Sequence, residues 1–128
     1  MVRERAEKVQ RVADYIPELE VNGAESGKLL VVGWGGTFGH LLSAVQEVRK
    51  EGMDISFAHF DYIMPLPRNT QKVFEKFDRI LVCELNSGHF VNYLRGIMPQ
   101  FRYEQFNKVQ GQPFLVQEVV GAIKDALR

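Results

Sequence analysis

Residues 31–40, with the sequence VVGWGGTFGH, join two different patterns in the chain. The stretch begins inside the apolar run LLVV, which does not alternate with polar residues and is therefore typical of a strand buried on both faces. Four of the seven positions from Gly33 to Gly39 are glycine, and an apolar stripe at helical spacing starts at Phe38. This stretch predicts a strand, a tight glycine-rich turn and a helix.

The same order of strand and helix recurs along the rest of the chain. Strands are predicted at residues 29–34, within 54–66, at 79–85 and, more weakly, at 101–106, and the second of them runs into a proline loop. Helices are predicted from Phe38, from Thr70 to Phe77, from about Asn86 to Pro99 and from Phe114 to Leu127. Alternation of this kind predicts an α/β domain of three layers. We expect a mostly parallel sheet of four or five strands, at least three of them parallel, between two layers of helices.

Two further segments precede this repeat. Apolar residues at helical spacing predict a leading helix, which Pro17 ends because the residue before a proline avoids the helical region. Residues 17–28 are polar and contain two glycines without any periodicity, which is typical of a linker. We therefore expect residues 1–28 to be a leading helix and linker from a preceding, absent domain, and residues 29–128 to be the α/β domain.

Composition restricts the classes of protein to which the chain can belong. It has 128 residues, with 16 basic and 16 acidic side chains, so no excess charge indicates binding to nucleic acid or to a membrane surface. The first residues are too charged for a secretion signal, and no apolar run is long enough to span a membrane. The single cysteine, Cys83, is typical of a reducing compartment, and we expect a cytoplasmic protein.

The glycine-rich turn matches neither of the common phosphate-binding motifs. A dinucleotide fingerprint, G-x-G-x-x-G, would need a third glycine at Phe38 when counted from Gly33. A P-loop, G-x-x-x-x-G-K, also fails at Phe38, and no lysine follows. Two interpretations stay open: backbone N–H groups at the start of the helix bind an anion weakly, or the glycines only let the chain turn sharply. We favour the second.

Side chains that commonly carry chemistry are few. The histidines have no metal-ligand spacing, and one cysteine cannot supply a zinc cluster or the four thiolates of an iron–sulfur centre. Cys83 lies inside an apolar strand and is expected to be an inert buried thiol. His59 and Asp61 share one face of a predicted strand, where the carboxylate orients the imidazole for chemistry or the pair simply packs with one hydrogen bond. We assign no residue a catalytic or metal-binding role.

The apolar run ILVC is followed abruptly by a mostly polar stretch that contains Glu84, Asn86, Ser87, Gly88 and His89. Loops at the carboxyl ends of parallel strands are where α/β sheets meet ligands and partners. Asn86 or Ser87 could instead simply cap the helix that follows. The stretch therefore predicts either a contact with a partner or a helix cap.

Four segments in this order and spacing resemble one known family: VVGWGGTFG, DYIMPLPRN, VCELNSGHFVNYLR and NKVQGQPF. The chain resembles the C-terminal domain of the alpha subunit of 2-oxoacid:ferredoxin oxidoreductases, nearest the 2-oxoglutarate type, over essentially its whole length. The resemblance implies the fold of the transketolase C-terminal region. One position departs from the family, because His89 stands where members usually carry glutamine, and this puts in doubt any contact that needs an amide there.

The resemblance also implies a larger parent enzyme. That enzyme oxidatively decarboxylates a 2-oxoacid to an acyl-CoA with thiamine diphosphate, Mg²⁺, an iron–sulfur cluster and coenzyme A, and passes electrons to ferredoxin. A pyrimidine-binding domain precedes this one in the same subunit, and the beta subunit carries the diphosphate-binding domain. The chain would then be a non-catalytic C-terminal fragment, cut at a domain boundary, that binds none of these cofactors itself. The alternatives are a free-standing module that binds a small molecule or anion, and an oligomerisation domain.

The residues expected to contact other parts of such an enzyme follow two of the predicted strands. We call Trp34, Thr37, Asn86, Ser87, His89 and Arg95 the strand-end surface; Gly35, Gly36, Gly39 and Gly88 are further candidates for the ligand loops. Trp34 is the one tryptophan of the chain, and Trp and Arg are enriched among residues that dominate interfaces. Trp34 covering its own core is the alternative.

Overall fold

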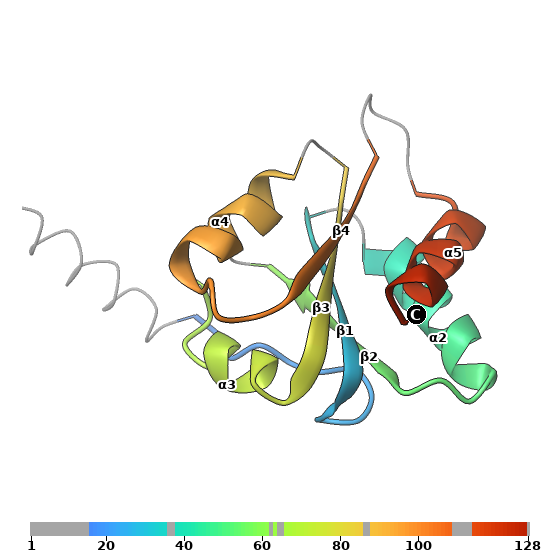
Figure 1. Ribbon diagram of the computed structural model, residues 1–128, viewed down its shortest axis with the longest axis horizontal. Coiled ribbons are helices and arrows are strands. Elements are labelled where there is room, and N and C mark those ends of the chain that lie inside the picture. Colours follow the sequence, from blue (N-terminus) through green and yellow to red (C-terminus); the bar gives the residue numbers. More distant parts are fainter. Residues whose placement is uncertain are drawn as a thin grey trace, which may run out of the picture.

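A computed structural model describes residues 16–35, 38–61, 63, 66–85, 88–108 and 114–127. The predicted leading helix, up to residue 15, lies outside the described residues. Four strands form one parallel sheet in the order β2-β1-β3-β4, with β1 at Gly27–Trp34, β2 at Ile55–Phe60, β3 at Phe77–Glu84 and β4 at Tyr103–Asn107 (Figure 1). The predicted mostly parallel α/β sheet is confirmed.

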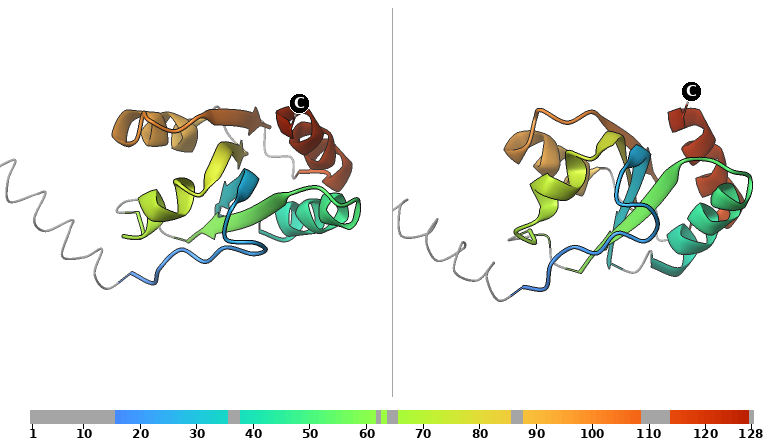
Figure 2. Two further views of the ribbon diagram at one scale, coloured as in Figure 1. Left: turned by 60° about the horizontal axis from the view of Figure 1, so that its bottom comes forward. Right: turned by 90° about the horizontal axis from the view of Figure 1, so that it is seen from below.

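Helices cover both faces of the sheet. Helices α2 (Phe38–Lys50) and α5 (Val116–Leu127) pack on one face, whereas α3 (Thr70–Phe74) and α4 (His89–Ile97) pack on the other (Figure 2). Each face has its own core, since successive side chains of a strand point to opposite sides. Leu29 and Val31 of β1 belong to the core under α2 and α5, and Leu30 and Val32 to the core under α3 and α4. The predicted three layers are confirmed.

Central strands are buried on both faces, as the LLVV run predicts. Leu29 and Val32 of β1 are fully inaccessible to solvent, and so are Val82 and Cys83 of β3. The C-terminal end of α2 also agrees with the sequence. Gly52 lies two residues after the last helical residue, has a φ of 86° and donates its N–H to the Arg49 carbonyl. A left-handed glycine at this place ends a helix without the steric penalty that a side chain would bring.

The stretch 54–66, predicted as a strand that runs into a proline loop, forms β2 as far as Phe60, and the chain bends at Asp61. Two other predicted details are wrong. Phe77 begins β3 instead of ending α3, and its ring is buried against the same core that α3 covers. Thr70 does not cap α3, since its hydroxyl donates to the Pro67 carbonyl at 2.6 Å and no side-chain cap hydrogen bond is present.

Residues 16–26, which we call the strap, are docked against the sheet instead of extending from it as a free linker. Leu19 is 6% exposed and belongs to the core under α3 and α4. Asn69 fixes the main chain of Leu19 from both sides: its Oδ1 accepts from the Leu19 N–H at 2.7 Å, and its Nδ2 donates to the Leu19 carbonyl at 2.9 Å. The Ser56 hydroxyl donates to the Ala24 carbonyl at 2.6 Å.

None of the helices in the described part of the chain is both long enough and apolar enough to cross a membrane.

Candidate functional site

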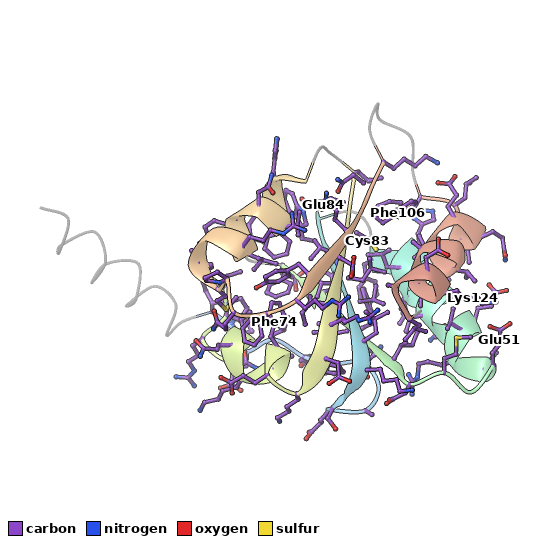
Figure 3. All side chains as sticks on the ribbon, viewed as in Figure 1. Glu51, Phe74, Cys83, Glu84, Phe106 and Lys124 are labelled. Carbon is purple, nitrogen blue, oxygen red and sulfur yellow. The ribbon has the colours of Figure 1, made fainter. Side chains whose placement is uncertain are left out.

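Glu84, the last residue of β3, organises the carboxyl end of the sheet. Its side chain is fully buried, and its two oxygens accept hydrogen bonds from the first turn of α4: Phe90 N–H to Oε1 at 2.7 Å and Val91 N–H to Oε2 at 3.0 Å (Figure 3). A carboxylate at a helix N-terminus satisfies backbone donors that have no partner within the helix and interacts favourably with the helix dipole. Glu84 therefore caps α4 from a neighbouring strand.

This cap corrects the sequence expectation that Asn86 or Ser87 caps the helix. The N-cap position is Gly88, which makes no side-chain hydrogen bond, and Asn86 and Ser87 themselves lie outside the described residues. Capping side chains normally bind the second and third N–H groups of a helix. Those groups, from Phe90 and Val91, already bind Glu84. An anion that approached this helix end would meet a carboxylate instead of free donors.

Trp34, at the end of β1, binds the same carboxylate. Its indole N–H donates to Glu84 Oε1 at 3.2 Å, and its ring meets the Phe90 ring edge-on, with 6.1 Å between centroids. Trp34 is half-buried and packs against the core under α3 and α4. The ring therefore has an internal role, as the alternative interpretation of the sequence states.

Gly88 lies where β3, β4 and α4 meet. Its φ of 93° is in the left-handed region, and a Cβ there would lie 3.2 Å from Gln105 Oε1 and 3.3 Å from Asn107 Nδ2. The left-handed conformation favours glycine at this position, and a Cβ would also be in tight contact with these two side-chain ends. The buried Oδ1 of Asn107, on the neighbouring strand end, has no hydrogen-bond partner among the described residues.

Arg95 is not brought together with the strand ends. It is exposed in the last turn of α4, about 9 Å along the helix from His89 at 1.5 Å per residue. Burial raises the pKa of Tyr103 to about 12, and the Arg95 charge nearby partly opposes this rise. Because Tyr103 begins β4, Arg95 lies toward the amino edge of the sheet, opposite to Trp34.

The remaining predicted residues are placed in part. His89 is exposed at the start of α4, Gly39 is exposed in the first turn of α2, and Gly35 is exposed with a φ of 70° directly after β1. Gly36 and Thr37 lie outside the described residues. The positive φ of Gly35 fits the predicted sharp turn, because a residue with a side chain rarely adopts it.

Cys83 and His59 have environments that sequence spacing only partly anticipates. Cys83 is fully buried, and burial together with the neighbouring Glu84 carboxylate raises its pKa, which keeps the thiol protonated and unreactive. His59 Nε2 lies 3.7 Å from Asp61 Oδ1, as their shared strand face predicts. Burial lowers the pKa of His59, although Asp61 and the Gly35 backbone oppose this effect. No group of three metal-ligating side chains occurs within the described ranges.

Comparisons with known proteins bear on this geometry. No family model matches the chain. The 2-oxoglutarate oxidoreductase subunit KorA of Mycobacterium tuberculosis is 32% identical to it over 132 residues, which cover 99% of this chain and 19% of that subunit. Subunit alpha of 2-oxoacid:ferredoxin oxidoreductase 1 from Aeropyrum pernix is 29% identical over 133 residues, covering 98% of this chain and 21% of that subunit.

This chain is a homologue of the C-terminal domain of these alpha subunits. The resemblance seen in the sequence is therefore confirmed. The chain spans about a fifth of the length of the curated relatives that it matches.

Solved structures agree with the fold of the chain. A 2-oxoglutarate:ferredoxin oxidoreductase from Magnetococcus marinus matches with a TM-score of 0.89 at 23% identity, over 100% of this chain and 23% of the other. A split-gene transketolase matches with a TM-score of 0.65 at 14% identity, over 84% of this chain and 41% of the other. The predicted likeness to a transketolase domain is thus confirmed as a likeness of fold.

Proposed function

We propose that this domain is a non-catalytic part of a 2-oxoacid:ferredoxin oxidoreductase, most nearly of the 2-oxoglutarate type. The observation that carries the proposal is the 32% identity to a 2-oxoglutarate oxidoreductase subunit along 99% of the chain. The parent enzyme would convert a 2-oxoacid to an acyl-CoA and pass the electrons to ferredoxin. A free-standing binding module or an oligomerisation domain is not favoured, because the similarity runs through the whole chain.

The division of labour within that enzyme rests on what this sequence contains. One cysteine is fewer than the four thiolates that an iron–sulfur cluster commonly takes. The sequence also has no G-D-G motif of the kind that would hold Mg²⁺ and a diphosphate. We therefore assign thiamine diphosphate, Mg²⁺, the cluster and the transfer to coenzyme A to other domains, including a preceding pyrimidine-binding domain and a beta subunit. With a single, buried cysteine, we also place the protein in the cytoplasm.

The role of the domain itself would be to pack subunits together through the carboxyl edge of its sheet. Three large apolar side chains are exposed on segments at that edge: Phe38 (48%) after β1, Leu85 (37%) after β3 and Leu115 (58%) before α5. We infer that these side chains contribute to one interface, because large exposed apolar areas commonly mark interaction sites. His89, the first residue of α4, is exposed close to these segments in the sequence. Trp34 would act indirectly by fixing the turn that precedes α2.

Two measurements on the purified 128-residue chain test this function. Calorimetry with thiamine diphosphate and Mg²⁺ should give no binding, and 2-oxoglutarate with coenzyme A and ferredoxin should give no turnover. A mixture of the beta subunit and a complete alpha subunit that contains this domain should show both thiamine diphosphate binding and turnover. Cofactor binding or turnover by the chain alone would show that the proposed division of labour is wrong.

A further inference from the structure

A groove of about 930 Å³ lies between the strap and the outer edge of β2, on the side of the sheet away from β4. Figure 2 shows the strap, in blue, running beside β2, in green. The strap lines one side of the groove with residues 17–23, and the other side has Gly35, Phe38, Phe57, His59, Asp61 and Pro67. The volume is in the range of sites that bind small ligands or peptide segments.

The groove opens because the strap leaves β2 after a single pairing. Asn22 and Phe57 exchange two main-chain hydrogen bonds, with the Asn22 N–H donating at 2.7 Å and the Phe57 N–H at 3.0 Å. Toward its amino end the strap turns away, since Leu19 is buried in the core and held by Asn69. The main-chain N–H and C=O groups of residues two positions apart point to the same side of a strand. The main-chain groups of His59 therefore point outward, as those of Phe57 do. His59 has no strand partner on that side within the described part of the chain.

The groove is lined by acidic side chains, which favour a ligand with positive charge. Glu18, Glu20 and Asp61 give it three carboxylates, and Asp61 is 80% exposed. Arg68 lies 3.4 Å from Glu18 and offsets one of them.

An aromatic wall accompanies these charges. The Phe38 ring is 48% exposed and lies 5.2 Å from the His59 ring, centroid to centroid. An exposed sheet edge beside an apolar wall and acidic groups suits an extended chain with basic side chains.

We propose that this groove receives an extended segment of a partner polypeptide, which pairs with the main chain of β2 at His59 and carries a lysine or arginine toward Glu20 and Asp61. An apolar residue of the same segment covers Phe38, because successive side chains of an extended chain point to opposite sides. The groove shares Phe38 with the proposed packing surface, but the inference rests on the outer edge of β2, and neither Leu85 nor Leu115 lines the groove.

The test is an NMR titration of the labelled 128-residue chain with a blocked peptide of alternating valine and lysine. We expect the amide signal of His59 and the ring signals of Phe38 to shift. In the double variant Glu20→Gln, Asp61→Asn, binding should weaken roughly threefold or more, in line with the loss of two exposed ion pairs. Both carboxylates are exposed, so the variant should fold normally.

Matched controls separate the contributions of charge and main chain. Glu104→Gln removes one carboxylate charge from β4 at the opposite edge of the sheet, compared with two in the double variant, and should leave binding unchanged. The same peptide with N-methylated amides keeps its charge but cannot pair with a strand, and should bind at least tenfold more weakly. The proposal is overturned if the N-methylated peptide binds as well, which would indicate a site for any cation. Shifts away from β2, equal binding of a glutamate peptide, or no shift at millimolar peptide would overturn it too.

Discussion

The indole N–H of Trp34 donates to the carboxylate of Glu84 at 3.2 Å, across 50 positions of sequence. The same carboxylate accepts two N–H groups at the start of α4. The end of β1, the end of β3 and the first turn of α4 are thus joined through one buried acidic side chain. This arrangement holds in place the chain segments from which the loops of the carboxyl edge emerge.

Replacing Glu84 with glutamine should destabilise the domain. In Glu84→Gln one of the two oxygens becomes an NH₂ group, which would face a backbone N–H of Phe90 or Val91 instead of accepting from it. A buried donor without a partner costs about 1–3 kcal/mol, and we expect a loss of about 2 kcal/mol in the free energy of unfolding. Urea denaturation at neutral pH, followed by the fluorescence of the single tryptophan, would measure it. Glu104→Gln, on the edge strand β4, is the matched control and should change stability by less than about 0.5 kcal/mol. Equal effects of the two substitutions would contradict the capping role.

Because His59 is partly buried, the stability of the domain should decrease as the pH is lowered. Burial lowers the pKa of His59 in the folded state below its ordinary value of 6.5, so the unfolded chain binds more protons between the two pKa values. The stabilising contribution is therefore fully present above about pH 6.5 and is lost as the pH falls toward the folded-state pKa. His59→Gln should have a shallower decrease in melting temperature from about pH 7.5 to about pH 5. His40→Gln, which replaces an exposed histidine of α2, should behave like the parent chain. An unchanged pH profile for His59→Gln would sink the prediction.

The strap should contribute substantially to the stability of the domain. A chain that begins at Gly27 lacks the buried Leu19, the two hydrogen bonds to Asn69 and the Asn22–Phe57 pairing. Because the shorter chain loses the burial of one leucine and a few hydrogen bonds, its free energy of unfolding should be lower by about 3 kcal/mol or more than that of a chain that begins at Ile16. Thermal unfolding of the two truncated chains compares them directly. If they melt together, the strap is only a linker, as its composition alone would indicate.

The sequence predicts the layers and the parallel sheet well, because the relevant signals are local. LLVV lacks alternation, and its four side chains are indeed fully buried in a central strand. The Glu84 cap could not be predicted in the same way. It depends on the register of β1 and β3, in which Val32 pairs with Val82 and the strand ends two residues further on lie together. Before a register is known, nothing relates Trp34 to Glu84, whereas nearby Asn86 and Ser87 are the usual capping residues.

Two predictions from local sequence patterns were wrong because they also depended on contacts between distant parts of the chain. Phe77 continues the helical spacing of Val73 and Phe74, yet it faces their core from the start of β3. An apolar residue shows that a position is buried, but not which element buries it. The strap was judged polar from its composition, although the buried Leu19, its hydrogen bonds to Asn69 and the pairing of Asn22 with Phe57 dock it against the sheet.

The proposed packing role depends on the carboxyl edge of the sheet, and two exposed apolar side chains allow a matched test. Leu85, 37% exposed, lies at that edge directly after β3, whereas Ile97, 48% exposed, ends α4 toward the opposite edge. Each would be changed to glutamate in an alpha subunit that contains this domain, and association with the beta subunit would be measured by analytical ultracentrifugation. The melting temperatures of the two variant domains alone should stay close to that of the parent. We predict that Leu85→Glu weakens association at least tenfold while Ile97→Glu does not; normal association of Leu85→Glu, or equal weakening by both, would contradict the account.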